Sequence, residues 1–549
     1  MRTNTIALAS LAYLLGTVQA KNEDDPAQKY DFIIVGGGTS GLVVANRLSE
    51  IQGVTVAVIE AGDSVFNNPN VTNVAGYGRA FGTHIDWAYQ TENQKYAGGS
   101  KQIMRAGKAI GGTSTINGMS YTRAQSVQID AWELFGNKGW NWGSLLPYYR
   151  KSEMFQIPSL NQISRGADYY ITYHGENGPL KVGWPTEITN RTMLPMLDQT
   201  FNQLGVPFNR DVNGGSMVGL TSHPNTVNAK ENVREDAARA YYWPYQNRSN
   251  LKIITNTLAN RIIWSNDSNS EAVAVGVEVT NSHHGIETIY ASKEVILSAG
   301  SLKSPILLEV SGIGNPDILT NQIYGKNVTD VASSINASMA EYAKVVSNSS
   351  KGAVQEANIL AAFKLQYDLI FESQVPFAEI VLLPIAGSFM SEYWPLLPFS
   401  RGSIHIKSAN ASMPASINPN YFMFKQDLDA QVDVAKFIRK AFATAPLGDL
   451  VGEEFSPGMD NLPDTASDSQ WGDWAKSNYR SNFHPVGTAS MLPRSRGGVV
   501  SPELRVYGTR NVRVVDASVL PFQLCGHLTS TLYAVAEKAA DMIKKQYRL

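Results

Sequence analysis

A glycine-rich loop near the N-terminus constrains the fold of this chain more than any other feature. Residues 31–35 form a short apolar run that is typical of a buried parallel strand. This run leads directly into Gly36, Gly38 and Gly41, and residues 42–48 continue as an amphipathic helix. In this context the three glycines allow a tight turn, a close approach of backbone to a pyrophosphate, and close packing of helix on strand. The pattern predicts a dinucleotide-binding loop.

Two further features fit this prediction. Thr39 and Ser40 stand where the helix begins, and a helix N-terminus offers free N–H groups and partial positive charge to phosphates. A second apolar run, residues 54–59, ends at Glu60, about 20 residues past the glycines, where a carboxylate can accept hydrogen bonds from a ribose. The alternative is a glycine-rich turn in an unrelated α/β protein. By themselves these residues do not distinguish FAD from NAD.

The length and net charge of the chain exclude some classes of binding partner. The chain has 549 residues and a formal net charge of −2, so it lacks the global basic field that nucleic acid or an anionic membrane would need. A small, near-neutral substrate is expected. After the N-terminus, no run of about 18–20 apolar residues predicts a membrane span. No CxxC, HExxH or histidine-rich cluster is present, so no metal is expected, and the single cysteine, Cys525, is expected to be a packed residue.

The first twenty residues predict export. Arg2 precedes an apolar core over residues 6–15, and residues 18–20 have the small-x-small pattern of a cleavage site, so residues 1–20 are interpreted as a signal peptide. The alternative is a disordered N-terminus. Eight Asn-x-Ser/Thr sites agree with a secreted glycoprotein: Asn70, Asn190, Asn247, Asn266, Asn327, Asn336, Asn348 and Asn410.

Four later segments resemble the glucose–methanol–choline (GMC) oxidoreductases, and the resemblance runs from about residue 30 to the C-terminus. Residues 105–119 (RAGKAIGGTSTINGM) and 300–314 (GSLKSPILLEVSGIG) are similar to the two GMC signatures, and residues 482–488 and 512–518 are similar to the C-terminal block. The resemblance is closest to the glucose-oxidase branch and implies FAD. It also implies cofactor contacts at Gly112, Thr113, Asn117, Gly118, Ser120, Asp516, Ala517 and Leu528.

The same resemblance implies the catalytic residues. His484 matches the general base, and a histidine suits this role because its pKa lies near working pH. His527 matches the second catalytic position, Glu379 matches an acid that orients it, and Arg480 matches an arginine that binds a sugar hydroxyl. Each also has a structural alternative, such as a surface residue.

Val381 and Leu382 stand where the branch has an aromatic substrate contact. This favours an aryl or polyketide-type alcohol, as in fungal secondary metabolism, over glucose.

The implied fold is α/β. A doubly wound FAD-binding domain is expected from the discontinuous segments 28–155, 222–315 and 475–549, and an α+β substrate domain with an antiparallel sheet from 156–221 and 316–474. The chain departs from the family after Gly314, where the usual D-L-P-G-V-G-x-N-L-x-D-H strand and loop are not found, so it is shorter by a few dozen residues.

Three hypotheses follow. The first is FAD-dependent oxidation of a small-molecule alcohol to an aldehyde, ketone or lactone, with oxygen or another electron acceptor. The second is non-redox lyase or cyclase chemistry on a bound flavin. The third is a catalytically defective relative that lost its flavin site with the missing segment.

Overall fold

The computed structural model describes residues 29–186, 193–265, 271–314, 335–349, 355–369, 373, 375–376, 378–385 and 387–549. The expected signal peptide lies outside these residues, and so does the segment after Gly314 where the chain is expected to be shorter than its family.

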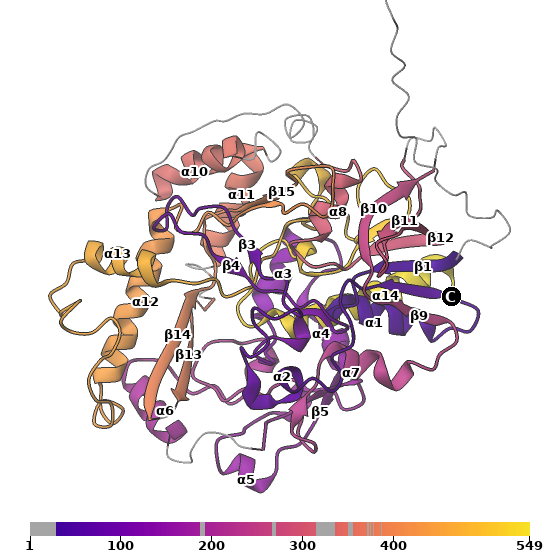
Figure 1. The fold of residues 1–549 in the computed structure, drawn as a ribbon. Helices are drawn as coiled ribbons and strands as arrows, with labels where there is room; N and C mark the ends of the chain where they lie inside the picture. The colour runs from indigo at the N-terminus through magenta and orange to yellow at the C-terminus, as the bar shows by residue number, and fades with distance from the viewer. Residues whose placement is uncertain are drawn as a thin grey trace, which may run out of the picture.

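A central sheet organises the larger part of the molecule (Figure 1). Its seven strands are β1 (Lys29–Val35), β2 (Val56–Ile59), β9 (Leu251–Ile254), β10 (Leu258–Trp264), β11 (Ala274–Thr280), β12 (Ile286–Leu297) and β17 (Val512–Val514). β9, β2, β1, β12 and β17 are parallel neighbours, whereas β10 and β11 extend the sheet in antiparallel pairing from the first part of β12. The side chains of residues 56–59 are fully or almost fully buried, as a parallel strand covered on both faces requires.

Helices from distant parts of the chain pack on this sheet and on each other. α1 (Thr39–Ser49) contacts β1, β2 and β9 and packs along α14 (Leu528–Tyr547), which in turn packs on α4 (Trp142–Ser152). α7 (Ala237–Tyr241) contacts α1, and α8 (Ser304–Val310) contacts β10. α14 brings the C-terminal segment beside the first βα unit, so both ends of the sequence build the same region.

The second part of the molecule lies on the other side of Figure 1 and contains small antiparallel sheets and helices. The strands are β13 (Ala378–Ile385), β14 (Ser388–Pro395), β15 (Ser403–His405) and β16 (Ser416–Asn418), and the helices are α6 (Met193–Gln203), α10 (Ile335–Ser349), α11 (Glu356–Tyr367), α12 (Lys425–Ala443) and α13 (Asp468–Asn478). β13 pairs with β14, and α12 packs on β14 and α13.

Short elements complete the described chain. They are α2 (Pro69–Thr72), α3 (Ser126–Leu134), α5 (Leu160–Ile163), β3 (Tyr89–Gln90), β4 (Ile103–Met104), β5 (Glu153–Phe155), β6 (Leu180–Val182), β7 (Val227–Asn228) and β8 (Val233–Arg234). Among the described residues, no helix has both the length and the apolar character to span a membrane.

The expected α/β fold class is confirmed, with the refinement that the central sheet is mixed. All seven strands of that sheet fall within the three segments expected to bind FAD, and β13 to β16 fall within the expected substrate segments. The exact division into domains stays a prediction.

Candidate active site

The loop between β1 and α1 shows why glycine is needed at two of its positions. A Cβ on Gly41 would lie 2.0 Å from the carbonyl oxygen of Gly36, so only glycine lets α1 pack this closely on the end of β1. Gly36 itself has a φ of +107°, and a Cβ there would lie 2.4 Å from the carbonyl oxygen of Ser298. Gly38 differs, since a Cβ there would meet only the Cα of Gly112, at 3.7 Å. The protein fold itself therefore does not require glycine at residue 38.

The N-terminus of α1 is suited to bind an anion. Gly38 is its N-cap residue, and no side chain caps the helix. Its first turn begins with Thr39 and Ser40, and N–H groups at an uncapped helix start can bind phosphate.

Glu60 lies at the end of β2 and holds this loop in place. One carboxylate oxygen accepts the Gly37 N–H at 2.8 Å, and the other accepts the Gly62 N–H at 2.7 Å. Burial raises the pKa of Glu60 to about 7, although these backbone donors and Lys108 oppose the effect. A carboxylate can accept about four hydrogen bonds, so the structure leaves acceptor capacity for a ribose.

A second glycine turn packs directly on the first. The Gly111 N–H donates to the carbonyl oxygen of Gly37 at 2.8 Å, and a Cβ on Gly112 would lie 2.6 Å from the Cα of Gly38. Thr113 and Gly118, from the same signature segment, are exposed. The two glycine segments, far apart in sequence, thus form one cradle of backbone that side chains would fill.

Asn117 is held by Arg234, a buried residue that sequence reasoning did not identify. Arg234 donates from Nη1 to the Asn117 side-chain oxygen at 2.7 Å and to its backbone oxygen at 2.8 Å. The Asn117 side-chain nitrogen lies 3.4 Å from the hydroxyl of Thr529 in α14. Ser120 follows and bridges to Asn225. This segment is therefore tied to both α14 and the loop around residue 225.

The C-terminal block meets the same cradle. Asp516 is buried, and its carboxylate accepts hydrogen bonds from the Gly300 N–H at 2.9 Å, the Ser304 hydroxyl at 2.6 Å, and both the N–H and the hydroxyl of Ser518. Its acceptor sites are all used within the protein. A cofactor contact at residues 516 and 517 would therefore be made by backbone, and Ala517 begins the single turn that Asp516 caps.

Leu528 is the first residue of α14, which directs a second helix N-terminus toward the site. The groups assembled here are the N–H donors of two helix starts and two glycine turns, the carboxylate acceptor of Glu60, and the amide side chain of Asn117. This set fits the pyrophosphate, ribose and ring of FAD.

His527, the residue before α14, lies at the centre of a cluster of aromatic and charged groups. Its Nε2 lies 3.0 Å from a carboxylate oxygen of Glu379. The ring of His484 stands edge-on to that of His527, with centroids 5.6 Å apart, and Trp394 stands edge-on from another side at 6.2 Å. The hairpin β13–β14 explains two of these positions, since Glu379 and Trp394 are directly opposite each other in its register.

The surroundings shift the pKa values of two histidines in this cluster in opposite directions. Burial, aided by the charge of His527, lowers the pKa of His484 to about 4. For His527 burial lowers the pKa, but the charge of Glu379 more than offsets this, so the pKa is raised overall. For Glu379 burial raises the pKa, and the charge of His527 outweighs it, so the pKa is lowered. Near neutral pH His484 is therefore a neutral imidazole, and the contact between His527 and Glu379 favours the charged form of both side chains.

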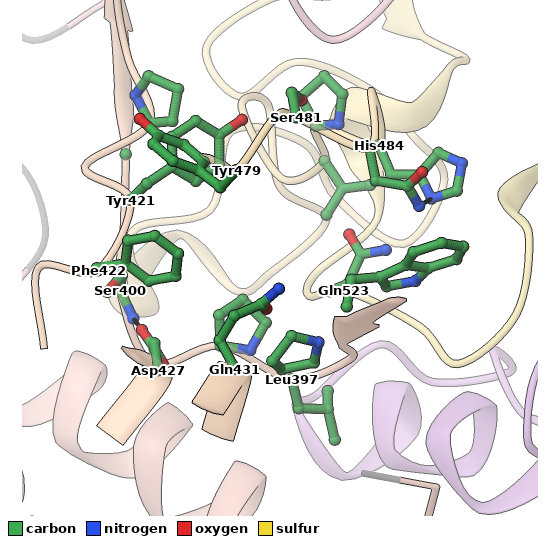
Figure 2. Close-up of a pocket in the computed structure, with 18 of the residues that line it drawn as sticks. Leu397, Ser400, Tyr421, Phe422, Asp427, Gln431, Tyr479, Ser481, His484 and Gln523 are labelled. Carbon is green, nitrogen blue, oxygen red and sulfur yellow. Dashed lines mark hydrogen bonds between the residues drawn. The ribbon is translucent and has the colours of Figure 1, made fainter. Parts of the chain in front are cut away.

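His484 also lines a cavity of about 2230 Å³. Figure 2 shows His484 and Gln523 on one side of it, with Tyr421 and Tyr479 on the opposite side. Phe483, the residue before His484, has a φ of +60°, a left-handed conformation that is uncommon for a bulky side chain.

Arg480 also lines this cavity, but it is already paired. Its Nη2 donates to Glu392 at 2.5 Å, and its guanidinium lies over the ring of Phe483 at 5.4 Å. Glu392 is two residues before Trp394 on β14, so the same face of the hairpin carries both. Any contact between Arg480 and a substrate would therefore involve this ion pair.

Sequence reasoning missed two members of the cluster, His223 and Trp394. The His223 ring stacks on that of His527 with centroids 6.2 Å apart and an interplanar angle of 26°. One signal was present, because His223 precedes a proline as His484 does. Within the part of the chain that the structure describes, no group of three or more His, Cys, Asp or Glu residues could hold a metal ion.

Comparisons with known proteins agree with this geometry. The N-terminal GMC oxidoreductase model matches residues 30–331, and the C-terminal GMC oxidoreductase model matches residues 398–536. A "Glucose oxidase-like protein fsoC" from Humicola fuscoatra is 42% identical over 98% of this chain and 98% of its own length. A glucose oxidase from Aspergillus carbonarius is 32% identical over 94% of this chain and 92% of its own.

Solved structures are also similar. An FAD-dependent oxidoreductase from Chaetomium thermophilum matches with a TM-score of 0.80 and 27% identity, covering 95% of this chain and 100% of that one. The alignment with the Humicola protein spans 584 positions, which exceeds the 549 residues of this chain by 35, so at least that many positions have no counterpart here. The expected FAD is confirmed as the cofactor. With both family models matched and a 42% identical relative over nearly its whole length, this chain belongs to the GMC oxidoreductase family.

Proposed function

We propose that this protein oxidises the CH–OH group of a small alcohol to a carbonyl, with His484 as the general base. FAD, when bound, accepts the hydride from the carbinol carbon. The residues of the chain must then bind the alcohol, orient it, and take the proton from its oxygen. The observation that supports this most directly is the cluster of His484, His527 and Glu379 at the start of α14, beside a cavity that His484 lines.

His484 suits the role of base because it is neutral. An imidazole with a pKa of about 4 is neutral at pH 7, so one of its ring nitrogens carries an electron pair that can accept a proton. Its Nδ1 lies 3.3 Å from the side-chain nitrogen of Asn482. Burial makes His484 a weak base before substrate binds. The proton transfer is helped if negative charge that develops on the substrate oxygen is stabilised at the same time.

His527 is placed to supply that stabilisation. Its ion pair with Glu379 favours the charged imidazolium, which can donate a hydrogen bond to the substrate oxygen. The two histidines thus have complementary roles, one accepting a proton and the other binding the oxygen that loses it. Arg480, Glu392 and the cavity beyond them would contact the remainder of the substrate.

We propose that the substrate is more apolar than a sugar. Val381 is two residues after Glu379 on β13, so both lie on the same face of the hairpin. A valine at this position, with Trp394 opposite Glu379, favours an aryl or polyketide-type alcohol. Oxygen or another acceptor would reoxidise the flavin.

Export is part of the same proposal. Residues 1–20 would be removed as a signal peptide, and among the described sequons Asn247, Asn348 and Asn410 are exposed and available to N-glycans. A mass spectrum of secreted protein that begins near Lys21 and shifts on deglycosylation would support this.

The test of the activity is the visible spectrum of the purified protein under nitrogen. Aryl, aliphatic and sugar alcohols are added in turn, and loss of the flavin bands reports hydride transfer. We expect bleaching by at least one aryl alcohol. A protein that retains its flavin but is not bleached by any alcohol contradicts the oxidation, and would instead favour the non-redox alternative.

The shortened chain favours a second candidate, a defective relative. At least 35 aligned positions of the Humicola protein are missing here, and the family segment after Gly314 is not found in the sequence. If that segment supplies part of the flavin site, the 549-residue chain binds FAD weakly or is poorly soluble. A flavin-to-protein ratio well below one, restored in a form carrying the segment, supports this candidate, and a fully flavinylated active chain rules it out.

A further inference from the structure

His223 lies in the catalytic cluster, and the proposed reaction gives it no task. It is half-buried, in a loop whose backbone is paired with the flavin signature segment. The Tyr121 N–H donates to the carbonyl oxygen of Pro224 at 3.0 Å, and the Thr226 N–H donates to that of Met119 at 2.8 Å. These bonds on both sides of the loop fix where the His223 ring lies.

The ring of His223 contacts the cluster through its face. It stacks on His527, with ring centroids 6.2 Å apart and an interplanar angle of 26°. Glu379 and His527 are the charged groups that influence it, with opposite signs. Burial and the charge of His527 lower the pKa of His223 to about 4, so its ring is neutral near pH 7.

His527 is therefore restrained from several directions. Glu379 holds one nitrogen, Trp394 and His484 stand against its ring edge-on, and His223 alone among these stacks on it at a small interplanar angle. The imidazole of His527 can rotate about its side-chain bonds, and a misaligned ring would not direct a hydrogen bond at the substrate oxygen. A flat neighbour on its face limits that rotation.

We propose that His223 is a positioning residue, whose neutral ring holds the imidazole of His527 in line with Glu379 and the substrate oxygen. The kcat measurements that test this inference rest on the proposed alcohol oxidation. A charged His223 would place a second positive charge against the His527 imidazolium, so the contact favours a neutral His223 ring.

The experiment compares His223→Ala, which removes the stacked ring, with His223→Phe, which keeps a ring that cannot be protonated. We expect His223→Ala to lower kcat about 3–10-fold, the worth of one aromatic contact, with KM nearly unchanged. His223→Phe should restore most of kcat. His283→Phe, at an exposed histidine outside the cavity, is the control and should leave kcat unchanged.

Three results would overturn the inference: unchanged kcat in His223→Ala, failure of His223→Phe to restore it, or a rise in KM alone, which would indicate a substrate contact. A second measurement does not need a substrate. In protein labelled with ¹³C-histidine, the titration of His223 should move to higher pH in His527→Gln, because the neighbouring positive charge is gone. An unmoved titration contradicts the coupling of the two rings, whereas absence of bleaching by alcohols contradicts only the proposed oxidation.

Discussion

Two histidine clusters in the described part of the molecule are built in opposite ways. In the first, His174 lies between two carboxylates, with Nδ1 2.8 Å from Glu153 and Nε2 3.0 Å from Asp211. Its ring stacks on Phe155 at 3.8 Å. Arg123, also buried, donates to Glu153 at 2.7 Å, so the charges in this cluster are paired.

In the active-site cluster, histidines outnumber carboxylates. Among the described residues, Glu379 is the carboxylate that faces His484, His527 and His223: one of its oxygens lies 3.0 Å from Nε2 of His527, and its charge also acts on the other two histidines. A cluster whose charges are paired stabilises the fold and leaves little capacity to bind a ligand. In the active-site cluster the second carboxylate oxygen of Glu379 is buried without a hydrogen-bond partner, and unpaired polar groups cost stability but remain available for a substrate. Burial differs as well, since His174 is buried whereas His484, His527 and His223 are half-buried.

The largest expected effect tests the catalytic side of this comparison. His484→Ala should slow flavin reduction by on the order of 10²–10⁴-fold, because the proposed base is lost, while the flavin content and the midpoint of thermal unfolding stay close to wild type. Stopped-flow absorbance under nitrogen measures the rate, with His283→Ala, at an exposed histidine outside the cavity, as the control. Equal reduction rates in the variant and the wild type would remove His484 from the mechanism.

Substitution of His174 should have the opposite effects, with lower stability and an unchanged rate of flavin reduction. His174→Ala leaves two buried carboxylates with fewer partners, and should lower the free energy of unfolding by about 3–5 kcal/mol. Protein that still folds should reduce its flavin at the wild-type rate. Urea denaturation followed by fluorescence gives the first quantity. A slow but stable variant would show that the two clusters are not functionally distinct.

The two carboxylate partners provide a matched pair. Glu379→Gln removes the charge that raises the pKa of His527, and should slow flavin reduction about 10–100-fold, the worth of one charge-assisted hydrogen bond. Asp211→Asn in the His174 cluster should lower thermal stability and leave that rate unchanged. If both substitutions slow the reaction equally, Glu379 acts through the fold rather than through His527.

The smallest expected effect is that His484 and His174 change the stability of the fold with pH in opposite directions. The pKa of His484 is lowered from 6.5 to about 4, so the unfolded chain binds more protons between these values, and this residue makes the fold less stable as pH falls from 6.5 to 4. For His174 burial lowers the pKa, but hydrogen bonds to Asp211 and Glu153 raise it overall. Its stabilisation is therefore complete below pH 6.5 and is lost as pH rises through the folded pKa.

Unfolding of His484→Phe and His174→Phe across pH 4–9 measures both signs. The advantage of His484→Phe over wild type should grow by about 1–2 kcal/mol toward low pH. The deficit of His174→Phe should shrink toward high pH. Parallel curves for the two variants would mean that the clusters do not differ in charge.

Much of the fold could be predicted where local sequence and structure coincide. The apolar run at residues 31–35 lies within β1, the run at 54–59 contains β2, and the stretch at 42–48 lies within α1. The predicted helix from about residue 528 to 545 lies within α14. The antiparallel strands β10 and β11 were not predicted, because their pairing with β12 depends on which segments the fold brings together.

By itself, the sequence determined the glycine loops, the strand and helix that flank them, and which histidines match a family motif, because each depends on residues close together in the chain. Only the tertiary structure decided which groups meet. It placed His223 on His527, Trp394 opposite Glu379, and Arg480 on Glu392. It also showed that Asp516 uses its carboxylate within the protein. The physical reason is that the charge and free hydrogen-bonding capacity of a side chain depend on its neighbours in space, and those neighbours come from distant parts of the chain.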